Sequence, residues 1–260
     1  MAESGFDLKK ARVLLSNDDG INAPGLKALE DAIRPHVREL WVCAPETEQS
    51  ATSHSLTLRR PLRIRHVSEH KYAVDGTPTD AVLLGVSRLM IDAKPDLVLS
   101  GINRGGNLGE DVTYSGTVAA AMEGAMLGIP SVALSQVYAD QHKVKWATAK
   151  SWTPKVLKML LAQGWPKGIF INVNFPDVTA AKVTGVEVVR QGRRKIGGDL
   201  TRGVDPRGDE YFWIGPQRDE QQFLKGTDLA SCYSGAVSVT ALALDLTDPA
   251  TLRKLKAGLK

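Results

Sequence analysis

Short apolar runs alternate with amphipathic segments along the first two thirds of the chain. The runs stop at polar or glycine-containing segments, as buried parallel strands do. After Pro24, apolar residues recur at helical spacing at Leu26, Leu29, Ile33 and Val37, which predicts a helix through these positions. The whole pattern predicts strands at 13–15, 40–44, 63–67, 72–74, 96–100, 131–134 and 169–173, and further helices at 79–90, 118–127 and 146–161.

Strands that alternate with helices predict an α/β fold with a doubly wound, mostly parallel sheet. After about residue 180 the pattern changes: strands are expected at 183–189, 211–214 and 236–244, separated by long loops rich in Gly, Arg and Asp. Long hairpins rarely stand alone in water, so this part is interpreted as an extension for subunit contacts. We therefore expect a core over residues 1–180 and a C-terminal β-rich extension over 181–260 that completes one domain.

The polar loops after the predicted strands at 13–15, 40–44 and 96–100 carry most of the candidate chemistry. In a doubly wound sheet, ligands bind beyond the carboxyl ends of the strands. These loops follow parallel strands, so we expect all three to converge on that one edge of the sheet.

Composition restricts the functional classes only weakly. The chain has 260 residues, 43% of them hydrophobic, and a net charge of +4 that is not gathered into one run, so nucleic acid is not an expected partner. Residues 1–10 lack the apolar core of a signal peptide, and Glu123 interrupts the longest apolar stretch. Cys43 and Cys232 form no C-x-x-C motif. We expect a cytoplasmic protein without a membrane span.

Asp18 and Asp19 are the most informative residues, because two adjacent carboxylates at a strand end repel each other unless something neutralises them. A hard cation such as Mg²⁺ or Mn²⁺ would do so through oxygen ligands. Taken alone, however, Asn-Asp-Asp-Gly is also good turn chemistry ahead of a helix. The doublet leaves both interpretations open.

Two further segments could bind an anion. In Ser100–Asn107 the glycines Gly105 and Gly106 would let backbone N–H groups approach a phosphate, and Asn103 could offer a neutral oxygen to a metal. Ser115, Gly116 and Thr117 stand at a predicted helix start, where backbone donors and the helix dipole favour anions. A tight turn and an ordinary N-cap are the respective alternatives.

The second loop contains Ser50, whose hydroxyl could reach a metal, and His54, a possible acid or base. A lone histidine in a loop is more often structural or solvated. The remaining histidines show no ligand spacing. The chain has no Gly-Lys pair of a Walker A loop, no H-E-x-x-H and no G-x-S-x-G. P-loop, zinc-protease and serine-hydrolase functions therefore lose support.

Together these motifs resemble the SurE family of survival-protein nucleotidases. Each motif alone is weak, but they occur in order along nearly the whole chain. The segments that carry the resemblance are 14–20 with 23–25, 44–45 with 49–50 and 55–57, 75–80, 95–98 with 100–103, 114–118, 205–208, 213–215, 226–228 and 237–240.

The resemblance implies a Rossmann-like core that binds one divalent cation per subunit, Mg²⁺ or Mn²⁺. It implies a phosphatase acting on nucleoside 5′- and 3′-monophosphates, in some members also on short polyphosphate. It further implies a homodimer or homotetramer that exchanges C-terminal arms. Carried over by position, the metal ligands would be Asp18, Asp19, Ser50 and Asn103. Separately, the residues that we expect to bind the substrate are Asn17, Gly105, Gly106, Ser115, Gly116 and Thr117.

Two departures from the family pattern are visible. Ala241 follows Val239 and Thr240 where proline is usual, which puts in doubt how that strand ends. The N-terminus carries roughly ten additional residues before the first strand, and we expect them to be disordered.

The resulting hypothesis for catalysis assigns Asp18, Asp19 and Asn103 to the reacting centre. Asp18 or Asp19 would hold the cation and accept a proton from an attacking water, while Asn103, the glycine backbone and residues 115–117 would stabilise charge on the phosphoryl oxygens. Direct attack by an aspartate is the alternative. The competing class is a nucleotide or phosphate sensor without turnover, which would not need two carboxylates facing an anion.

Overall fold

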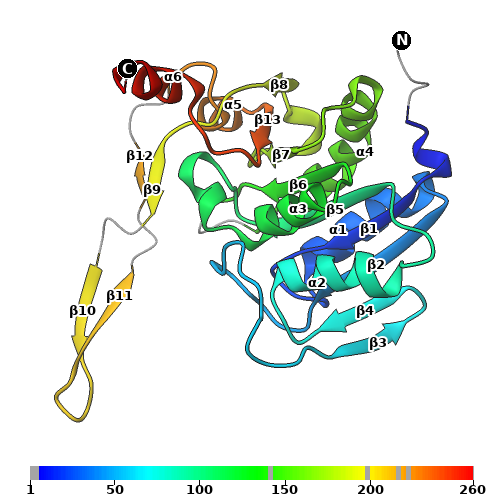
Figure 1. The fold of residues 1–260 in the computed structure, drawn as a ribbon, viewed down its shortest axis with the longest axis horizontal. Helices are drawn as coiled ribbons and strands as arrows, with labels where there is room; N and C mark the ends of the chain where they lie inside the picture. The colour runs from blue at the N-terminus through cyan, green and yellow to red at the C-terminus, as the bar shows by residue number, and fades with distance from the viewer. Residues whose placement is uncertain (1–5, 140–142, 197–199, 215–217, 221–223, 260) are drawn as a thin grey trace.

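The computed structural model describes residues 6–139, 143–196, 200–214, 218–220 and 224–259. In this part of the chain, nine strands form one sheet in the order β3-β4-β2-β1-β5-β6-β7-β13-β8 (Figure 1). The strands are β1 (Arg12–Ser16), β2 (Glu39–Pro45), β3 (Ile64–Ser68), β4 (Lys71–Val74), β5 (Leu97–Arg104), β6 (Ser131–Gln136), β7 (Ile169–Phe175), β8 (Val186–Val188) and β13 (Val237–Ala243). β4, β2, β1, β5, β6 and β7 are parallel neighbours, whereas β3 and β13 pair antiparallel with β4 and β7. The predicted α/β sheet is confirmed.

Helices cover both faces of the sheet, because successive strand residues point to opposite sides. Val13 and Leu15 of β1 pack in one core cluster with α1 (Pro24–Ile33) and α4 (Trp146–Gln163). Leu14 between them faces a second cluster with α2 (Pro78–Leu84). The remaining helices are α3 (Gly116–Met126), which packs beside α2, α5 (Asp228–Tyr233) and α6 (Pro249–Gly258).

Two predicted helices end earlier than expected. α1 stops at Ile33 rather than at Val37, and Arg34–His36 form a 3-10 turn. Pro35 explains the difference, because proline lacks the backbone N–H that would donate the next hydrogen bond of the helix. The helix predicted over 79–90 divides into α2 and a π-helical turn at Gly85–Leu89.

The N-terminal expectation was also wrong where the chain is described. Leu8–Lys10 form a 3-10 helix, and the Phe6 and Leu8 side chains pack against the core. Residues 1–5 lie outside the described part. The expected disorder therefore does not hold for residues 6–10, because two apolar side chains anchor them.

The C-terminal part departs furthest from the prediction. After β8, an arm formed by β9 (Arg194–Ile196), β10 (Leu200–Val204), β11 (Glu210–Ile214) and β12 (Arg218–Glu220) projects from the body of the molecule (Figure 1). β9 pairs with β12, and β10 pairs with β11. The chain then returns through α5 to β13, which pairs with β7 in the main sheet. α5 and α6 were not predicted, and the domain boundary near residue 180 stays a prediction.

One backbone contact fixes the start of α1 against β5. Gly25 lies so close to β5 that a Cβ atom there would be 1.9 Å from the carbonyl oxygen of Ile102. Only glycine permits this approach. The contact places the loop between β1 and α1 beside the end of β5, where Asn103 lies.

Candidate functional site

The loops after β1, β2 and β5 meet at the carboxyl edge of the sheet, as the parallel arrangement predicts. β1 lies between β2 and β5, so the three strand ends are neighbours. A cavity of about 400 Å³ opens there. Its lining consists of Asp18, Asp19, Glu48, Ser50, Ala51, Asn103, Arg104, Gly105, Gly106, Asn107, Asp111, Tyr114, Ser115 and Tyr138.

Asp18 and Asp19 occupy the first loop. Asp18 is only 5% exposed, and the hydroxyl of Thr117 donates a hydrogen bond to its Oδ1. Burial raises the pKa of Asp18 to about 6, with a further contribution from the neighbouring charge of Asp19. Burial likewise raises the pKa of Asp19, although the backbone N–H of Arg104 donates to its Oδ2 at 3.1 Å and opposes the shift. Two carboxylates thus share a site in which ionisation is unfavourable.

The second loop supplies Ser50 and a further carboxylate. The Ser50 hydroxyl donates to Oε1 of Glu48 at 2.7 Å, and the N–H of Gln49 donates to the carbonyl oxygen of Asp18 at 2.7 Å. The latter bond ties this loop to the aspartate loop. The charge of Glu48 contributes to the raised pKa of Asp19.

The third loop contributes Asn103 and the two glycines. The Asn103 Nδ2 donates to the carbonyl oxygen of Gly105 at 2.9 Å, so its amide orientation is set within the loop. Gly105 adopts φ +119, a left-handed conformation that other residues rarely adopt. The N–H of Gly105 donates to the carbonyl of Gln136 at the end of β6.

The start of α3 closes one side of the cavity. Ser115 is the N-cap of α3 and accepts a hydrogen bond from the N–H of Val118 at 3.1 Å, so the ordinary capping role is present. A Cβ atom at Gly116 would lie 2.7 Å from the Cβ of Asp18. The helix therefore approaches the aspartate loop closely, and the partial positive charge of its N-terminus is directed at this region.

Some predicted residues lie behind the cavity surface. Asn17, Gly116 and Thr117 are fully or largely buried, and they do not belong to the cavity lining. Asn17 donates from Nδ2 to the carbonyl of Gly20 at 2.9 Å. His54 does not reach the cavity lining either; its Nε2 lies 2.9 Å from Oε2 of the buried Glu123.

Several lining residues were not among the predicted site residues, including Glu48, Ala51, Asp111 and Tyr138. Tyr138 follows β6 and therefore lies at the same edge, so the rule that located the other loops would have found it. Its ring lies 5.4 Å from the guanidinium carbon of Arg104. Asp111 carries no such signal, because it sits in a 3-10 helix (Gly109–Thr113) that the sequence pattern did not predict.

The donor set is suited to a divalent cation with oxygen ligands. Asp18 and Asp19 offer carboxylates, while Ser50 and Asn103 offer a hydroxyl and an amide oxygen. Among the described residues, no group of three or more His, Cys, Asp or Glu side chains is arranged to hold a metal, so neutral oxygens would have to complete a coordination shell. The buried like charges and their raised pKa values agree with a site that needs a cation.

No helix within the described ranges is long and apolar enough to cross a bilayer.

Comparison with known proteins gives a consistent result. The family model "Survival protein SurE" matches residues 13–198. A protein of Paramagnetospirillum magneticum named 5′-nucleotidase SurE is 60% identical over 252 residues, 97% of each chain. One of the same name from Parvibaculum lavamentivorans is 50% identical and covers 100% of this chain and 94% of its own. A crystal structure of the SurE protein from Aquifex aeolicus has a TM-score of 0.84 at 39% identity and covers 96% of this chain and 100% of its own. The chain belongs to the SurE family.

Proposed function

We propose that this protein is a divalent-metal-dependent 5′-nucleotidase that hydrolyses nucleoside 5′-monophosphates to nucleoside and phosphate. The observation that carries the proposal is the cavity that Asp18 and Asp19 line together with Gly105 and Gly106. The names of the relatives from Paramagnetospirillum and Parvibaculum support the reaction class. Nucleoside 3′-monophosphates and short polyphosphate are further substrates in the proposal.

Asp18, Asp19, Ser50 and Asn103 would hold the cation, which we take to be one Mg²⁺ or Mn²⁺ per subunit. When bound, such an ion supplies Lewis acidity, withdrawing electron density from a phosphoryl oxygen and acidifying water. It would also offset the repulsion between two aspartates and an anionic substrate. Without that offset, the negative charge of the cavity opposes phosphate binding.

The protein's own groups account for orientation and charge stabilisation. The backbone N–H of Gly106 and the N-terminal end of α3 provide positive partial charge for phosphoryl oxygens, whereas the N–H of Gly105 is bonded to the Gln136 carbonyl. The side chain of Arg104 lines the same cavity and adds a full positive charge. The Thr117 hydroxyl donates a hydrogen bond to the Asp18 carboxyl and so orients the group that we assign as cation ligand and proton acceptor. Attack by water with an aspartate as proton acceptor is preferred to an aspartyl-phosphate intermediate. Trapping of an acyl-phosphate with borohydride during AMP turnover would contradict this preference.

Phosphate release from AMP, measured with Mn²⁺, with EDTA, and with EDTA followed by excess Mn²⁺, tests the proposal. We expect activity in the first assay, loss in the second and recovery in the third. AMP binding without turnover under all three conditions would instead establish a nucleotide sensor. If EDTA does not reduce AMP hydrolysis, the proposed metal dependence is wrong, but the proposed nucleotidase activity still holds.

We further infer that two or four copies assemble by exchanging the C-terminal arm. The β10–β11 hairpin exposes large apolar side chains, among them Phe212, Trp213 and Ile214. An isolated two-stranded hairpin is marginally stable in water, so a second copy covering this surface would explain both its apolar character and its persistence. Light scattering coupled to gel filtration should give a mass of at least twice 28.1 kDa. A monomer at micromolar concentration would refute the inference.

A further inference from the structure

Arg194, the first residue of β9, is buried at the base of the arm. Its side chain is 2% exposed, and that of its partner Asp111 is 3% exposed. Fully buried arginine is rare and is normally paired with an acid. Here Nε donates to Asp111 Oδ2 at 2.8 Å, and Nη2 pairs with the same carboxylate oxygen.

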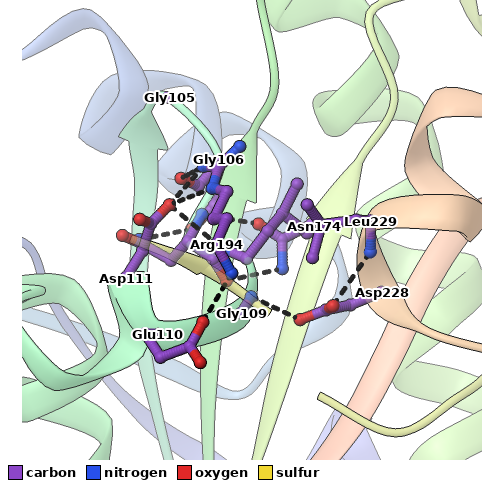
Figure 2. Close-up of polar contacts among 12 residues, drawn as sticks. Gly105, Gly106, Gly109, Glu110, Asp111, Asn174, Arg194, Asp228 and Leu229 are labelled. Atoms are coloured by element: carbon purple, nitrogen blue, oxygen red, sulfur yellow. Dashed lines mark hydrogen bonds and ion pairs between the residues drawn. The ribbon is translucent and has the colours of Figure 1, made fainter. Parts of the chain in front are cut away.

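The guanidinium has donors left for two further groups. Nη2 donates to the carbonyl oxygen of Gly106 at 3.1 Å, and Nη1 lies 3.3 Å from the Tyr233 hydroxyl in α5. Figure 2 shows the Arg194 side chain between Asp111 and Gly106. One side chain from the arm thus contacts two residues that line the cavity, Asp111 and Gly106.

The Gly106 carbonyl belongs to a peptide group that is fixed at both ends. The N–H of Asn107, in the same peptide plane, donates to Asn174 Oδ1 at 2.8 Å. Arg194 fixes the oxygen. Because a peptide group is planar, these two bonds set its orientation. Gly105 and Gly106 have no side chains to restrain them, so external anchors must define the shape of the loop.

The same region has a second connection between the arm and the cavity wall. The Asp228 carboxylate accepts hydrogen bonds from the N–H of Gly192 at 2.7 Å and from the N–H of Gly109 at 2.9 Å. The N–H of Arg194 itself donates to Glu110. The start of the arm is therefore bonded to the 3-10 helix that follows the glycine loop, which holds Arg194 in place (Figure 2).

We propose that Arg194 is a positioning residue for the nucleotidase reaction: by holding the Gly106 carbonyl and Asp111, it fixes the glycine loop that faces the phosphoryl group. The inference rests on the proposed function and extends it. According to this inference, the base of the arm holds the active-site loop in position, in addition to any role of the arm in subunit contacts.

Arg194→Lys is the direct test. Lysine keeps the positive charge that neutralises Asp111 but lacks the planar fork that reaches Asp111, Gly106 and Tyr233 together. Misplacement of the loop by a fraction of an ångström to 1 Å should lower kcat for AMP by roughly 10- to 100-fold. KM should change by less than about threefold, because the loop is assigned mainly to charge that develops in the transition state.

Arg193→Ala is the matched control. Arg193 is the neighbouring residue, its side chain is 75% exposed, and its ion pair with Glu110 is long at 3.7 Å. Its kcat and KM should equal those of wild type. All variants are assayed well below their unfolding midpoints and normalised to folded protein, so that a purely structural role of Arg194 would leave kcat unchanged. A kcat of Arg194→Lys within twofold of wild type overturns the inference.

A second set of variants covers the case in which lysine destabilises the fold. Arg194→Gln combined with Asp111→Asn removes both buried charges and keeps polar groups at both positions. If the two residues act through one loop geometry, the kcat losses of the single variants should not multiply in the double variant. The inference would be overturned if the kcat losses of the two single variants multiplied in the double variant, or if the double variant turned over AMP nearly as fast as wild type. Wild-type protein that fails to hydrolyse AMP would instead refute the proposed function itself.

Discussion

The cavity and the arm both place side chains in an environment opposite to the one they prefer. In the cavity, the carboxyl of Asp18 is 5% exposed. In the arm, the Trp213 side chain is 68% exposed and that of Ile214 is 70% exposed. A buried carboxylate and an exposed indole are each costly in isolation. In the proposed function the two regions are completed differently: a cation would neutralise the carboxylates of the cavity, and a second copy of the chain would cover the apolar surface of the arm.

The largest effect should come from removing one charge of the cavity. Asp19→Asn should lower AMP turnover by roughly 10³-fold, because one cation ligand and its charge are lost while the side-chain shape is kept. Phosphate release and thermal unfolding are measured together. Asp92→Asn, at an exposed position before β5 at the opposite edge of the sheet, is the control and should match wild type. Near wild-type turnover of Asp19→Asn would refute the site.

Asp18→Asn should make the metal-free protein more stable at neutral pH. The folded pKa of about 6 lies above the ordinary value of 3.8, so ionisation costs stability as pH rises through 6. The substitution removes that cost and should raise the free energy of unfolding by about 2–3 kcal/mol at pH 8. The gain should vanish below pH 4. Urea unfolding in EDTA at several pH values measures it, and a gain that does not depend on pH would contradict the assigned cause.

Gly116→Ala tests how closely α3 must approach the aspartates. The added Cβ would lie 2.7 Å from the Cβ of Asp18, so the aspartate loop must shift. We expect kcat to fall by about tenfold and the protein to lose about 1–2 kcal/mol of stability. The control is Gly128→Ala, where nothing lies within 4 Å but φ is +79, so stability alone should fall. Equal kcat values for the two variants would show that the close approach of α3 to Asp18 does not matter for turnover.

The smallest effect on fold stability is expected in the arm. Replacing Phe212 and Trp213 together by serine should change the unfolding free energy of the single chain by less than about 0.5 kcal/mol, because both side chains are exposed. The oligomer should nevertheless dissociate. Leu246→Ser, at a side chain 90% exposed outside the arm, should leave the mass unchanged. Light scattering distinguishes these results, and an intact oligomer in the double variant would show that the arm is not its interface.

The sequence predicted the core well because its signals are local. Runs such as Val13–Leu15 alternate between two helix-covered faces, and the loops after them converge through strand direction alone. α6 could also have been found, since Asp248 caps it and Pro249 begins it. α5 has only six residues, too few for a periodic pattern.

The rest of the candidate site depends on contacts that no local pattern encodes. Arg194 and Asp111 are 83 positions apart, and Asp228 is 119 positions from Gly109. In the sequence, Arg194 lies in a basic segment that resembles a solvated loop. Its role follows only from burial and from the partners that the fold brings to it. The assignment of the individual cavity residues to metal and substrate stays a prediction until tested.

The contact of Gly25 with the Ile102 carbonyl affects how natural variants of this chain should be interpreted. Any larger residue at position 25 would force the first helix away from its neighbouring strand and reduce the amount of intact protein in the cell. A change at Asp19 would leave protein abundance normal and remove turnover. Both variants would give the same deficient phenotype, and immunoblotting beside an enzyme assay would separate them.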